Sequence, residues 1–380
     1  MENKIIKYQP NEIIKKADNY LEHLKFLAPQ KTDPFLIPYR KGNKWGFCTE
    51  DKKIVIECVY DRTKHFSEGL APICLNRKYG YINSMGEIVI DFKYDSADSF
   101  SEGLANVRFN GSRYLINYFG EIVTDCLDSI SGFSEGLMAI QINRKWGYIN
   151  SNGVIVIDCV YDHTKNFSEG LAPICFNRKW GYINSNGVNV SDCIYDNTYG
   201  FSEGLAAVCL NGKYGYINSK GEIVIEFKYD SAHSFSENLA GVSLNGKYGF
   251  INSLEEVVIE FKYARVREFS EGLAGVSLNG KYGYINSLGE IVIDFKYDST
   301  TFFSEGLAWV RLNGKDGLIN SSGIIVIDCI YEHLSKFSNG IASVANEWYF
   351  GEYKYGYTEY AGGAIINGYI NKLGVEYWED

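Results

Sequence analysis

Apolar and polar residues alternate along most of this chain in short runs, which is the pattern of half-buried β-strands. The clearest stretch lies between Phe269 and Asp298, where residues 273–278, 281–286 and 290–297 form three such runs. Turns rich in asparagine, serine and glycine separate the runs. The pattern therefore predicts a three-stranded β-meander in this stretch.

The same stretch recurs along the chain. Its opening Phe-Ser pair returns every 34 residues, with one interval of 33. The phenylalanines are Phe66, Phe100, Phe133, Phe167, Phe201, Phe235, Phe269, Phe303 and Phe337. A period this strict predicts a tandem array of one supersecondary unit. Because a lone meander of this size is marginally stable, the units are expected to stabilise one another by stacking.

Two features of the repeat carry local predictions. Asn279-Gly280 stands between two alternating runs and predicts a type I′ hairpin turn, which needs positive φ at both residues. Arginine replaces that glycine at Arg77, Arg144 and Arg178, so these turns are expected to be strained or of another type. Gly283 interrupts a strand, which indicates that a ring or backbone approaches it closely.

We therefore expect an all-β fold of about nine to ten 34-residue meanders. An open, solenoid-like superhelix is favoured, because three strands are few for a propeller blade; the alternative is a closed, many-bladed propeller. Residues 10–27 have helical periodicity and Pro29 follows, which predicts a short N-terminal helix, either a cap or a partner-docking helix. The expected division is a helical cap and linker at residues 1–34 and a repeat array at 35–380.

Residues 347–364 interrupt the last repeat with an insertion rich in aromatic residues and glycine. Terminal repeats are often atypical because they must protect an edge. The insertion is accordingly interpreted as a cap, or alternatively as a site for a ligand or partner.

Composition and charge argue against several classes of function. The net charge of −10 disfavours binding to nucleic acid or anionic lipid, both of which need clustered cations. No apolar run is long enough to span a membrane, and the first residues do not resemble a signal peptide. We therefore expect a cytoplasmic protein without membrane insertion.

The residues that could carry catalysis mostly follow the repeat. Five cysteines stand where other repeats have phenylalanine and are expected to be buried apolar residues, whereas Cys74, Cys175 and Cys209 are expected to be exposed. The odd cysteine count and the lack of a CxxC motif argue against disulfides and zinc. The acids recur in register, so no catalytic pair is distinguished. We expect no enzyme, cofactor or metal.

The repeat resembles the bacterial WG-repeat family. The similarity rests on an aromatic-glycine-aromatic motif that Ile-Asn usually follows, and it extends from about residue 38 to the end. The motif begins at Trp45, Tyr79, Trp146, Trp180, Tyr214, Tyr248 and Tyr282. Tyr114-Leu115 and Asp316-Gly317 depart from it. The resemblance implies a β-hairpin repeat and no particular activity.

Function is therefore expected where the repeats differ. The four-residue link before each repeat phenylalanine varies most, and stacking would align the links into one surface. We predict a non-enzymatic scaffold for protein–protein interaction, with the partner on the links. The alternative is carbohydrate or cell-envelope binding by the aromatic-glycine rings, if these are exposed instead of packed between repeats. The candidate binding residues are Arg62, Lys64, His65, Arg265, Arg267, Trp309, Trp348 and Tyr349.

Overall fold

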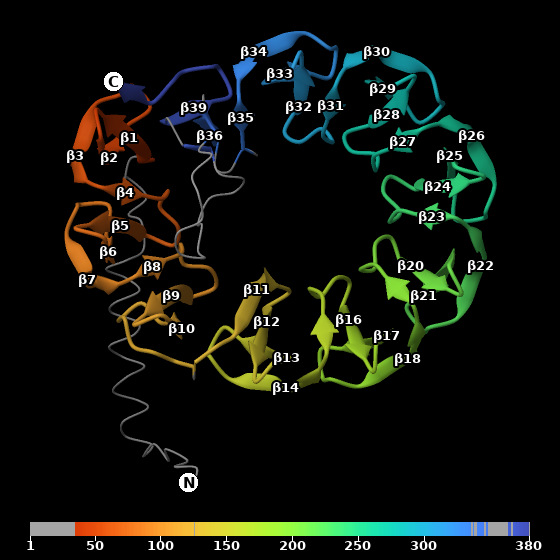
Figure 1. Cartoon of the computed structure of the whole chain (residues 1–380), viewed down its shortest axis with the longest axis horizontal. Coiled ribbons are helices and arrows are strands. Elements are labelled where there is room, and N and C mark those ends of the chain that lie inside the picture. The colour runs from red at the N-terminus through yellow and green to blue at the C-terminus, as the bar shows by residue number, and fades with distance from the viewer. Residues whose placement is uncertain are drawn as a thin grey trace, which may run out of the picture. The chain divides into compact units, whose positions relative to one another are not determined.

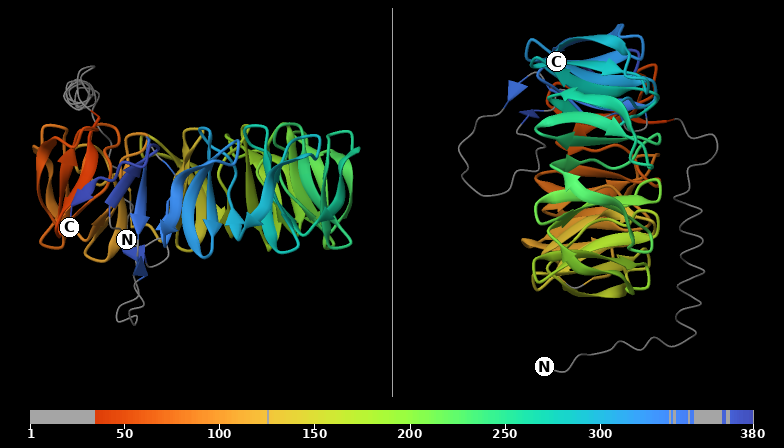
Figure 2. Two further views of the ribbon diagram at one scale, coloured as in Figure 1. Left: turned by 90° about the horizontal axis from the view of Figure 1, so that it is seen from above. Right: turned by 90° about the vertical axis from the view of Figure 1, so that its right-hand side faces the viewer.

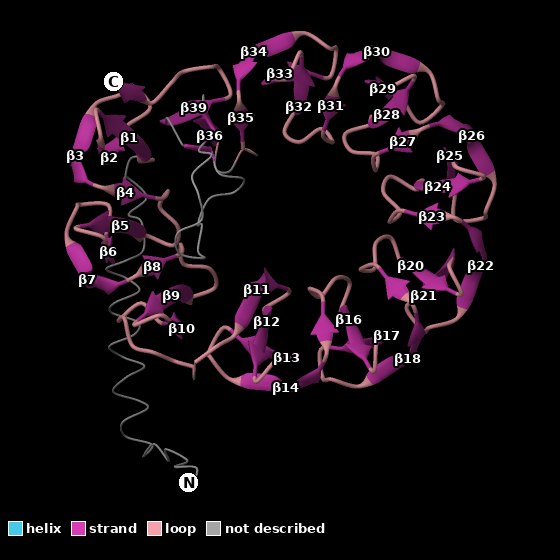
Figure 3. Ribbon diagram, in the orientation of Figure 1, coloured by secondary structure: helices cyan, strands magenta, loops and turns pink. Residues whose placement is uncertain are grey.

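The computed structural model is a succession of antiparallel β-sheets (Figures 1 and 3). It describes residues 35–124, 126–335, 337, 340–345, 347–348, 364–365 and 368–379. The helix predicted near the N-terminus, like Tyr349, lies outside the described residues. The chain divides into two compact units, one formed by residues 1–125 and 379–380 and the other by residues 126–378.

The described part of the first unit contains three sheets. The first has the order β3 (Ile54–Tyr60), β2 (Lys44–Cys48), β1 (Ile37–Lys41) and β40 (Trp378–Glu379). The second consists of β4 (Arg62–Thr63), β5 (Ala71–Leu75), β6 (Lys78–Ile82) and β7 (Ile88–Tyr94). The third consists of β8 (Ser96–Ala97), β9 (Ala105–Phe109) and β10 (Ser112–Ile116).

The second unit repeats one four-stranded sheet. Its first three sheets are β11 (Ser129–Ser134), β12 (Leu137–Ile142), β13 (Lys145–Asn150) and β14 (Ile155–Tyr161); β15 (His163–Thr164), β16 (Leu171–Phe176), β17 (Lys179–Asn184) and β18 (Asn189–Tyr195); and β19 (Asn197–Thr198), β20 (Leu205–Leu210), β21 (Lys213–Asn218) and β22 (Ile223–Tyr229).

Three similar sheets and a shorter one follow. They are β23 (Ser231–Ala232), β24 (Ala240–Leu244), β25 (Lys247–Ile251) and β26 (Val257–Tyr263); β27 (Arg265–Val266), β28 (Ala274–Leu278), β29 (Lys281–Ile285) and β30 (Ile291–Tyr297); β31 (Ser299–Thr300), β32 (Leu307–Leu312), β33 (Lys315–Asn320) and β34 (Ile325–Tyr331); and β35 (His333–Leu334), β36 (Ile341–Ala345) and β39 (Gly368–Asn371). A small hairpin pairs β37 (Glu347–Trp348) with β38 (Ala364–Ile365).

The prediction of three strands per repeat is wrong, because the variable link forms a fourth. Arg265 and Val266 pair antiparallel with Ser277 and Val276, so each link starts the next sheet. In the second unit the sheets stand side by side, with link strands on the inner side and β14, β18, β22, β26, β30 and β34 on the outer side (Figures 1 and 2). These are propeller-type blades, so the solenoid that we favoured is not supported.

The turn prediction is confirmed. Asn279 and Gly280 have φ of 52° and 81°, as a type I′ turn requires. The arginine-containing turns keep the same geometry, since Asn177 and Arg178 have φ of 51° and 64°. The strain that we anticipated therefore falls on the arginine, whose Cβ is unfavourable at positive φ.

The recurring glycine is explained by the next strand. A Cβ at Gly283 would lie 2.5 Å from the main-chain oxygen of Ile293, closer than any real contact. The pairing of β29 with β30 shifts register here, and this irregularity brings the backbone inward. Tyr114 occupies the glycine register in β10, and in the described residues that sheet has no fourth strand. The glycine is thus needed for the outer strand.

The core lies between neighbouring sheets. In one cluster Tyr284, Ile293 and Tyr297 of the β27–β30 sheet pack against Phe303 and Val310 of the next repeat. Equivalent clusters recur along both units. Burial of apolar surface thus depends on neighbouring repeats, as the sequence predicts.

Candidate functional site

The variable links divide into core and surface positions. The second residue of most links is buried, as Ala232, Val266 and Thr300 show with exposed fractions of 1%, 6% and 0%. The first and third residues point away from this core, and Arg265 and Arg267 are exposed. We define the inner edge as the first and third link residues of the second unit from residue 163 onward: His163, Lys165, Asn197, Tyr199, Ser231, His233, Arg265, Arg267, Ser299, Thr301, His333 and Ser335.

The first three candidate residues lie in the first unit. Arg62 is exposed in β4. Lys64 forms an ion pair with Asp98, with 2.6 Å between Nζ and Oδ1, so its charge is partly used in a contact between repeats. Burial lowers the pKa of His65 and nearby Lys64 lowers it further, which favours the neutral imidazole.

Two exposed arginines of the inner edge, Arg265 and Arg267, lie in one link, and exposed Glu268 follows them. Six repeats in the described chain pair the lysine after the hairpin turn with an aspartate 17 residues later, such as Lys281 with Asp298 at 2.6 Å. Ala264 replaces that aspartate next to Arg265, so the pair is missing for exposed Lys247. Burial, followed by the charge of Arg267, lowers the pKa of His233. Lys247 lies in one repeat and Arg265 and Arg267 lie in the next link. The aspartate that pairs with the equivalent lysine in other repeats is absent here.

The recurring acids have structural roles. The glutamates of the Phe-Ser-Glu turns have positive φ. Most of their carboxylates accept a main-chain N–H from the next repeat, namely those of Glu68, Glu135, Glu169, Glu203, Glu237 and Glu271. Glu169 accepts from Gly204 at 2.9 Å, and Glu271 accepts from Gly306 at 2.9 Å. The neighbouring serine hydroxyl donates to the next repeat phenylalanine, as Ser270 does to the Phe303 oxygen at 2.7 Å. The Phe-Ser-Glu signature is therefore a clamp between repeats.

The ring ladder is largely buried. The second aromatic residue of the motif has an exposed fraction of 0% at Tyr182, Tyr216 and Tyr284. Its ring packs against the next repeat phenylalanine, with 4.8 Å between the ring centroids of Tyr284 and Phe303. The Tyr284 hydroxyl donates to the main-chain oxygen of Thr301 at 2.9 Å. These rings are core residues and present no face for stacking on a sugar.

The cysteine prediction was wrong for four residues. Cys126, which we expected to be buried, is exposed, and the other four cysteines at phenylalanine positions are half-buried. Cys74, Cys175 and Cys209 are buried, with exposed fractions of 4%, 3% and 6%. They pair with the first aromatic residue of the motif across the hairpin, as Cys175 does with Trp180, and that ring helps to cover them. Sequence alternation misplaced them because both faces of these strands are packed between sheets. Among the described residues, no group of three ligating side chains is positioned to hold a metal ion.

A cavity of about 440 Å³ opens between the β31–β34 sheet and the β35–β36–β39 sheet. We call it the Leu318 pocket. It is lined by Thr301, Phe302, Ser304, Leu307, Trp309, Leu318, His333, Leu334, Ser335, Phe337 and Lys372. Leu318 pairs with Trp309 across the strands, in the register that joins Tyr284 to Gly275 one repeat earlier. Leucine therefore stands where the preceding repeat has a ring.

Lys372 adds polarity at the border of this pocket. Its ammonium pairs with the carboxylate of Glu305, a glutamate of the turn series, and so links two successive repeats. Trp309, a residue selected from sequence, lies in the wall of the pocket. Trp348 belongs to β37, and nothing further of its side chain is described.

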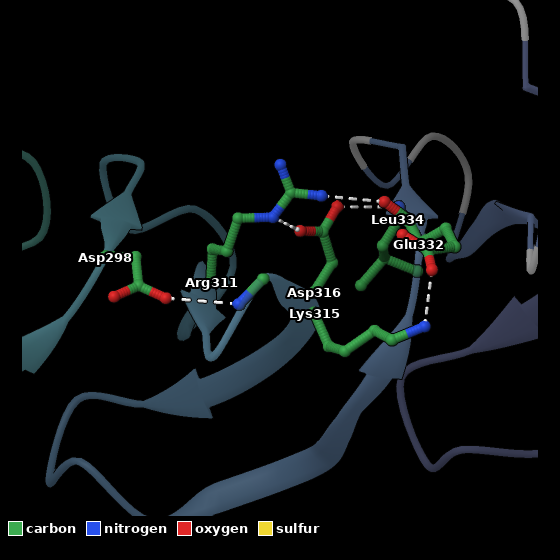
Figure 4. Close-up of polar contacts among 7 residues, drawn as sticks. Asp298, Arg311, Lys315, Asp316, Glu332 and Leu334 are labelled. Carbon is green, nitrogen blue, oxygen red and sulfur yellow. Dashed lines mark hydrogen bonds and ion pairs between the residues drawn. The ribbon is translucent and has the colours of Figure 1, made fainter. Parts of the chain in front are cut away.

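A buried ion pair lies in the same sheet. Asp316 replaces the first aromatic residue of the motif and is 1% exposed. Arg311 Nε lies 2.9 Å from Asp316 Oδ1, and the other carboxylate oxygen accepts the Leu334 N–H at 3.2 Å (Figure 4). Burial raises the pKa of Asp316, and the Arg311 charge opposes that rise. Arg311 also donates to the main-chain oxygen of Glu332 at 2.8 Å.

Sequence reasoning noted that Asp316 departs from the motif but did not identify the pocket. A second departure from the motif, two residues after Asp316, could have indicated the pocket. Leu318 stands where the other repeats of the second unit have Tyr148, Tyr182, Tyr216, Phe250 and Tyr284. Because the ring is a core residue, its loss leaves space that the neighbours do not fill.

Comparison with solved structures shows only weak likeness. A eukaryotic initiation factor is 9% identical, with a TM-score of 0.48, over 82% of this chain and 89% of its own. Hsv2p of Kluyveromyces lactis is 8% identical, with a TM-score of 0.34, over 59% of this chain and 92% of its own. The extracellular domain of a putative hybrid two component system of B. thetaiotaomicron is 10% identical, with a TM-score of 0.28, over 83% of this chain and 60% of its own.

No curated protein matches the chain. The described residues contain no helix of the length and apolarity needed to cross a membrane. The family described as "WG containing repeat" matches at residues 45–79, 79–112, 115–146, 146–180, 180–214, 214–248, 248–282, 282–315 and 317–347. These nine consecutive matches follow the repeats defined above, and the two gaps between them, at residues 113–114 and 316, fall at the two departures from the motif. The chain is therefore a member of the WG-repeat family.

Proposed function

We propose that this protein is a non-enzymatic scaffold that binds a protein partner along the inner edge of its second unit. The observation that carries the proposal is that recurring and variable residues occupy different places within each repeat. The glutamates, serines and buried rings that recur in most copies are used in contacts between repeats. The first and third link residues change from copy to copy and lie outside the core.

Charge indicates which partner fits. Arg265 and Arg267 are exposed on the inner edge, and Lys247 lacks the aspartate that its equivalents have. In a chain of net charge −10, a local group of cations favours an acidic protein segment. A cytoplasmic location belongs to the same proposal, and the nine free cysteines support a reducing compartment.

The carbohydrate alternative is not the one that we propose. Stacking on a sugar needs exposed ring faces, and the second ring of the motif is buried in the described repeats of the second unit that carry it. The first ring of the motif is half-buried. It lies opposite a residue of the preceding strand of the hairpin, as Tyr282 lies opposite Ser277.

The test exchanges link residues for those that the chain itself uses elsewhere. Arg265→Ser and Arg267→Thr copy Ser299 and Thr301 of the next link. The matched control, Lys220→Ser with Lys262→Thr, removes the same charge from an exposed turn and an outer strand. Both variants are immobilised and used for affinity capture from native lysate, with mass spectrometry of the retained proteins.

We expect the link variant to lose a saturable partner that the control retains, with less than about 2 °C change in Tm for either. Raising the salt concentration should weaken capture by the wild type, because exposed charges are screened. Equal capture by the link variant and the control would contradict the proposal.

A further inference from the structure

We propose that the Leu318 pocket binds an aromatic side chain, preferably that of tyrosine, presented by the protein partner. This deepens the proposed function and rests on it for the source of the ring. The ligand chemistry follows from the protein's own repeats, because the neighbouring interfaces contain a covalently attached copy of the ring that this pocket lacks.

The geometry of the missing ring is preserved at four tyrosine interfaces in the second unit. Each tyrosine ring lies 4.8 or 4.9 Å, centroid to centroid, from the repeat phenylalanine of the following sheet. Each hydroxyl donates to the main-chain oxygen of the third link residue at 2.7 to 2.9 Å. A ring at this position therefore satisfies both packing and hydrogen bonding.

The pocket keeps part of the surroundings of that ring. Leu307 and Phe337 stand in the registers of Leu273 and Phe303, which pack with Tyr284 one repeat earlier. Ser335 is the third link residue, the register whose carbonyl accepts the tyrosine hydroxyl elsewhere. A phenol in the pocket would therefore meet an aromatic partner at Phe337 and a polar group at Ser335.

Two further substitutions distinguish this interface. Trp309 replaces the glycine that faces Tyr284, so the pocket gains a large aromatic wall. Leu334 replaces the small or polar second link residue of neighbouring repeats, such as Thr300, and makes the opposite wall apolar. An apolar cavity with aromatic walls and few polar groups is the usual form of a site for a small aromatic group.

The pocket lies on the proposed binding surface. Thr301, His333 and Ser335 belong both to its lining and to the inner edge. A partner segment that follows the inner edge could thus place a tyrosine in the pocket while its acidic residues lie near Arg265 and Arg267 in the preceding link.

The test uses p-cresol, the side-chain analogue of tyrosine, in an NMR titration of the full chain. We expect saturable binding of one p-cresol in the millimolar range or tighter, as suits a ligand of this size. 4-Methylcyclohexanol has a similar size and hydroxyl group without the aromatic ring, and should bind at least about fivefold more weakly, since it lacks the ring–ring contact. Equal binding of the two would overturn the aromatic specificity.

Two variants locate the site. Leu318→Tyr restores the repeat ring, so it should abolish p-cresol binding and raise Tm by filling the cavity. Tyr284→Leu makes the reverse change one repeat earlier and should raise the stoichiometry to two. Should that variant fail to fold, Leu318→Tyr alone decides, because unchanged p-cresol binding in that variant would overturn the proposal.

The remaining outcomes are also decisive. Binding that occurs only after residues 349–363 are replaced by a glycine-serine linker would assign the pocket to the chain's own tyrosines and contradict a partner ring. Absence of p-cresol binding in the wild type, with the partner still captured through the links, would overturn the pocket and leave the scaffold proposal standing. Normal p-cresol binding, together with capture of the partner that does not change in the link variant, would overturn the scaffold proposal and leave the pocket standing.

Discussion

The carboxylate of Glu271 accepts a hydrogen bond from the main-chain N–H of Gly306, 2.9 Å away in the following repeat. Glu271 has a φ of 54°, which is unusual for a residue with a side chain. Its conformation and its contact are linked, because the type I′ turn directs the carboxylate toward the next turn. The repeat signature thus encodes an interaction between units.

Glu271→Ala should lower the free energy of unfolding by about 1 kcal/mol, the usual contribution of one hydrogen bond with a charged partner at the surface. The measurement is a urea denaturation curve. Glu260→Ala is the matched control, because Glu260 is exposed on the outer strand of the preceding sheet. Equal stability of the two variants would show that the contact contributes nothing.

Gly283→Ala should be strongly destabilising, by about 3 kcal/mol or more, because the new Cβ would lie 2.5 Å from the Ile293 main-chain oxygen. The backbone of β30 would have to move, and its pairing with β29 would weaken. Gly132→Ala is the control, since a Cβ there has no neighbour within 4 Å. Differential scanning calorimetry of both variants checks the prediction, and it fails if the two lose the same stability.

Arg178→Gly should stabilise the protein by about 1 kcal/mol. Arg178 adopts a φ of 64° in a type I′ turn, and glycine reaches that conformation without a Cβ penalty. Gly280→Ala at the equivalent position should have the opposite sign, since it introduces the penalty at a φ of 81° with no steric neighbour. Chemical denaturation of both variants tests the sign, and a destabilised Arg178→Gly would refute the strain.

Arg311→Ser should destabilise the protein by about 3 kcal/mol near neutral pH, because it leaves Asp316 buried without its counter-ion. Arg311→Ser combined with Asp316→Tyr restores the Ser277–Tyr282 pair of the previous repeat and should be at least as stable as the wild type. Tm measurements on the two variants make the comparison. A double variant no better than Arg311→Ser alone would contradict the interpretation.

The same pair predicts a pH dependence. Burial holds the pKa of Asp316 above its ordinary value of 3.8, and loss of Arg311 would raise it further. The folded state then binds more protons than the unfolded state, so the contribution of this group to stability falls as pH rises from about 3.8 through the folded pKa. The deficit of Arg311→Ser relative to wild type should therefore shrink on acidification toward pH 4, and a constant deficit would exclude the mechanism.

The sequence by itself determined the period, the β class, the type I′ turns and the need for a glycine at Gly283. These are local properties, fixed by backbone conformation and by alternation along one strand. The clamp formed by Ser270 and Glu271 was visible only as a repeated motif, because its partners, Phe303 and Gly306, belong to another repeat.

Only the tertiary structure decided which of the variable residues are exposed at the surface. Val266 and Thr300 in the links, and Cys175 in the following strand, were expected to be exposed and are buried, since each sheet packs neighbours on both faces. The link forms a fourth strand because its N–H and C=O groups pair with the hairpin that follows it. The alternation of apolar and polar residues within a single strand does not reveal such pairing. The Leu318 pocket likewise exists only between two sheets, where a ring supplied by every neighbouring repeat of the second unit is missing.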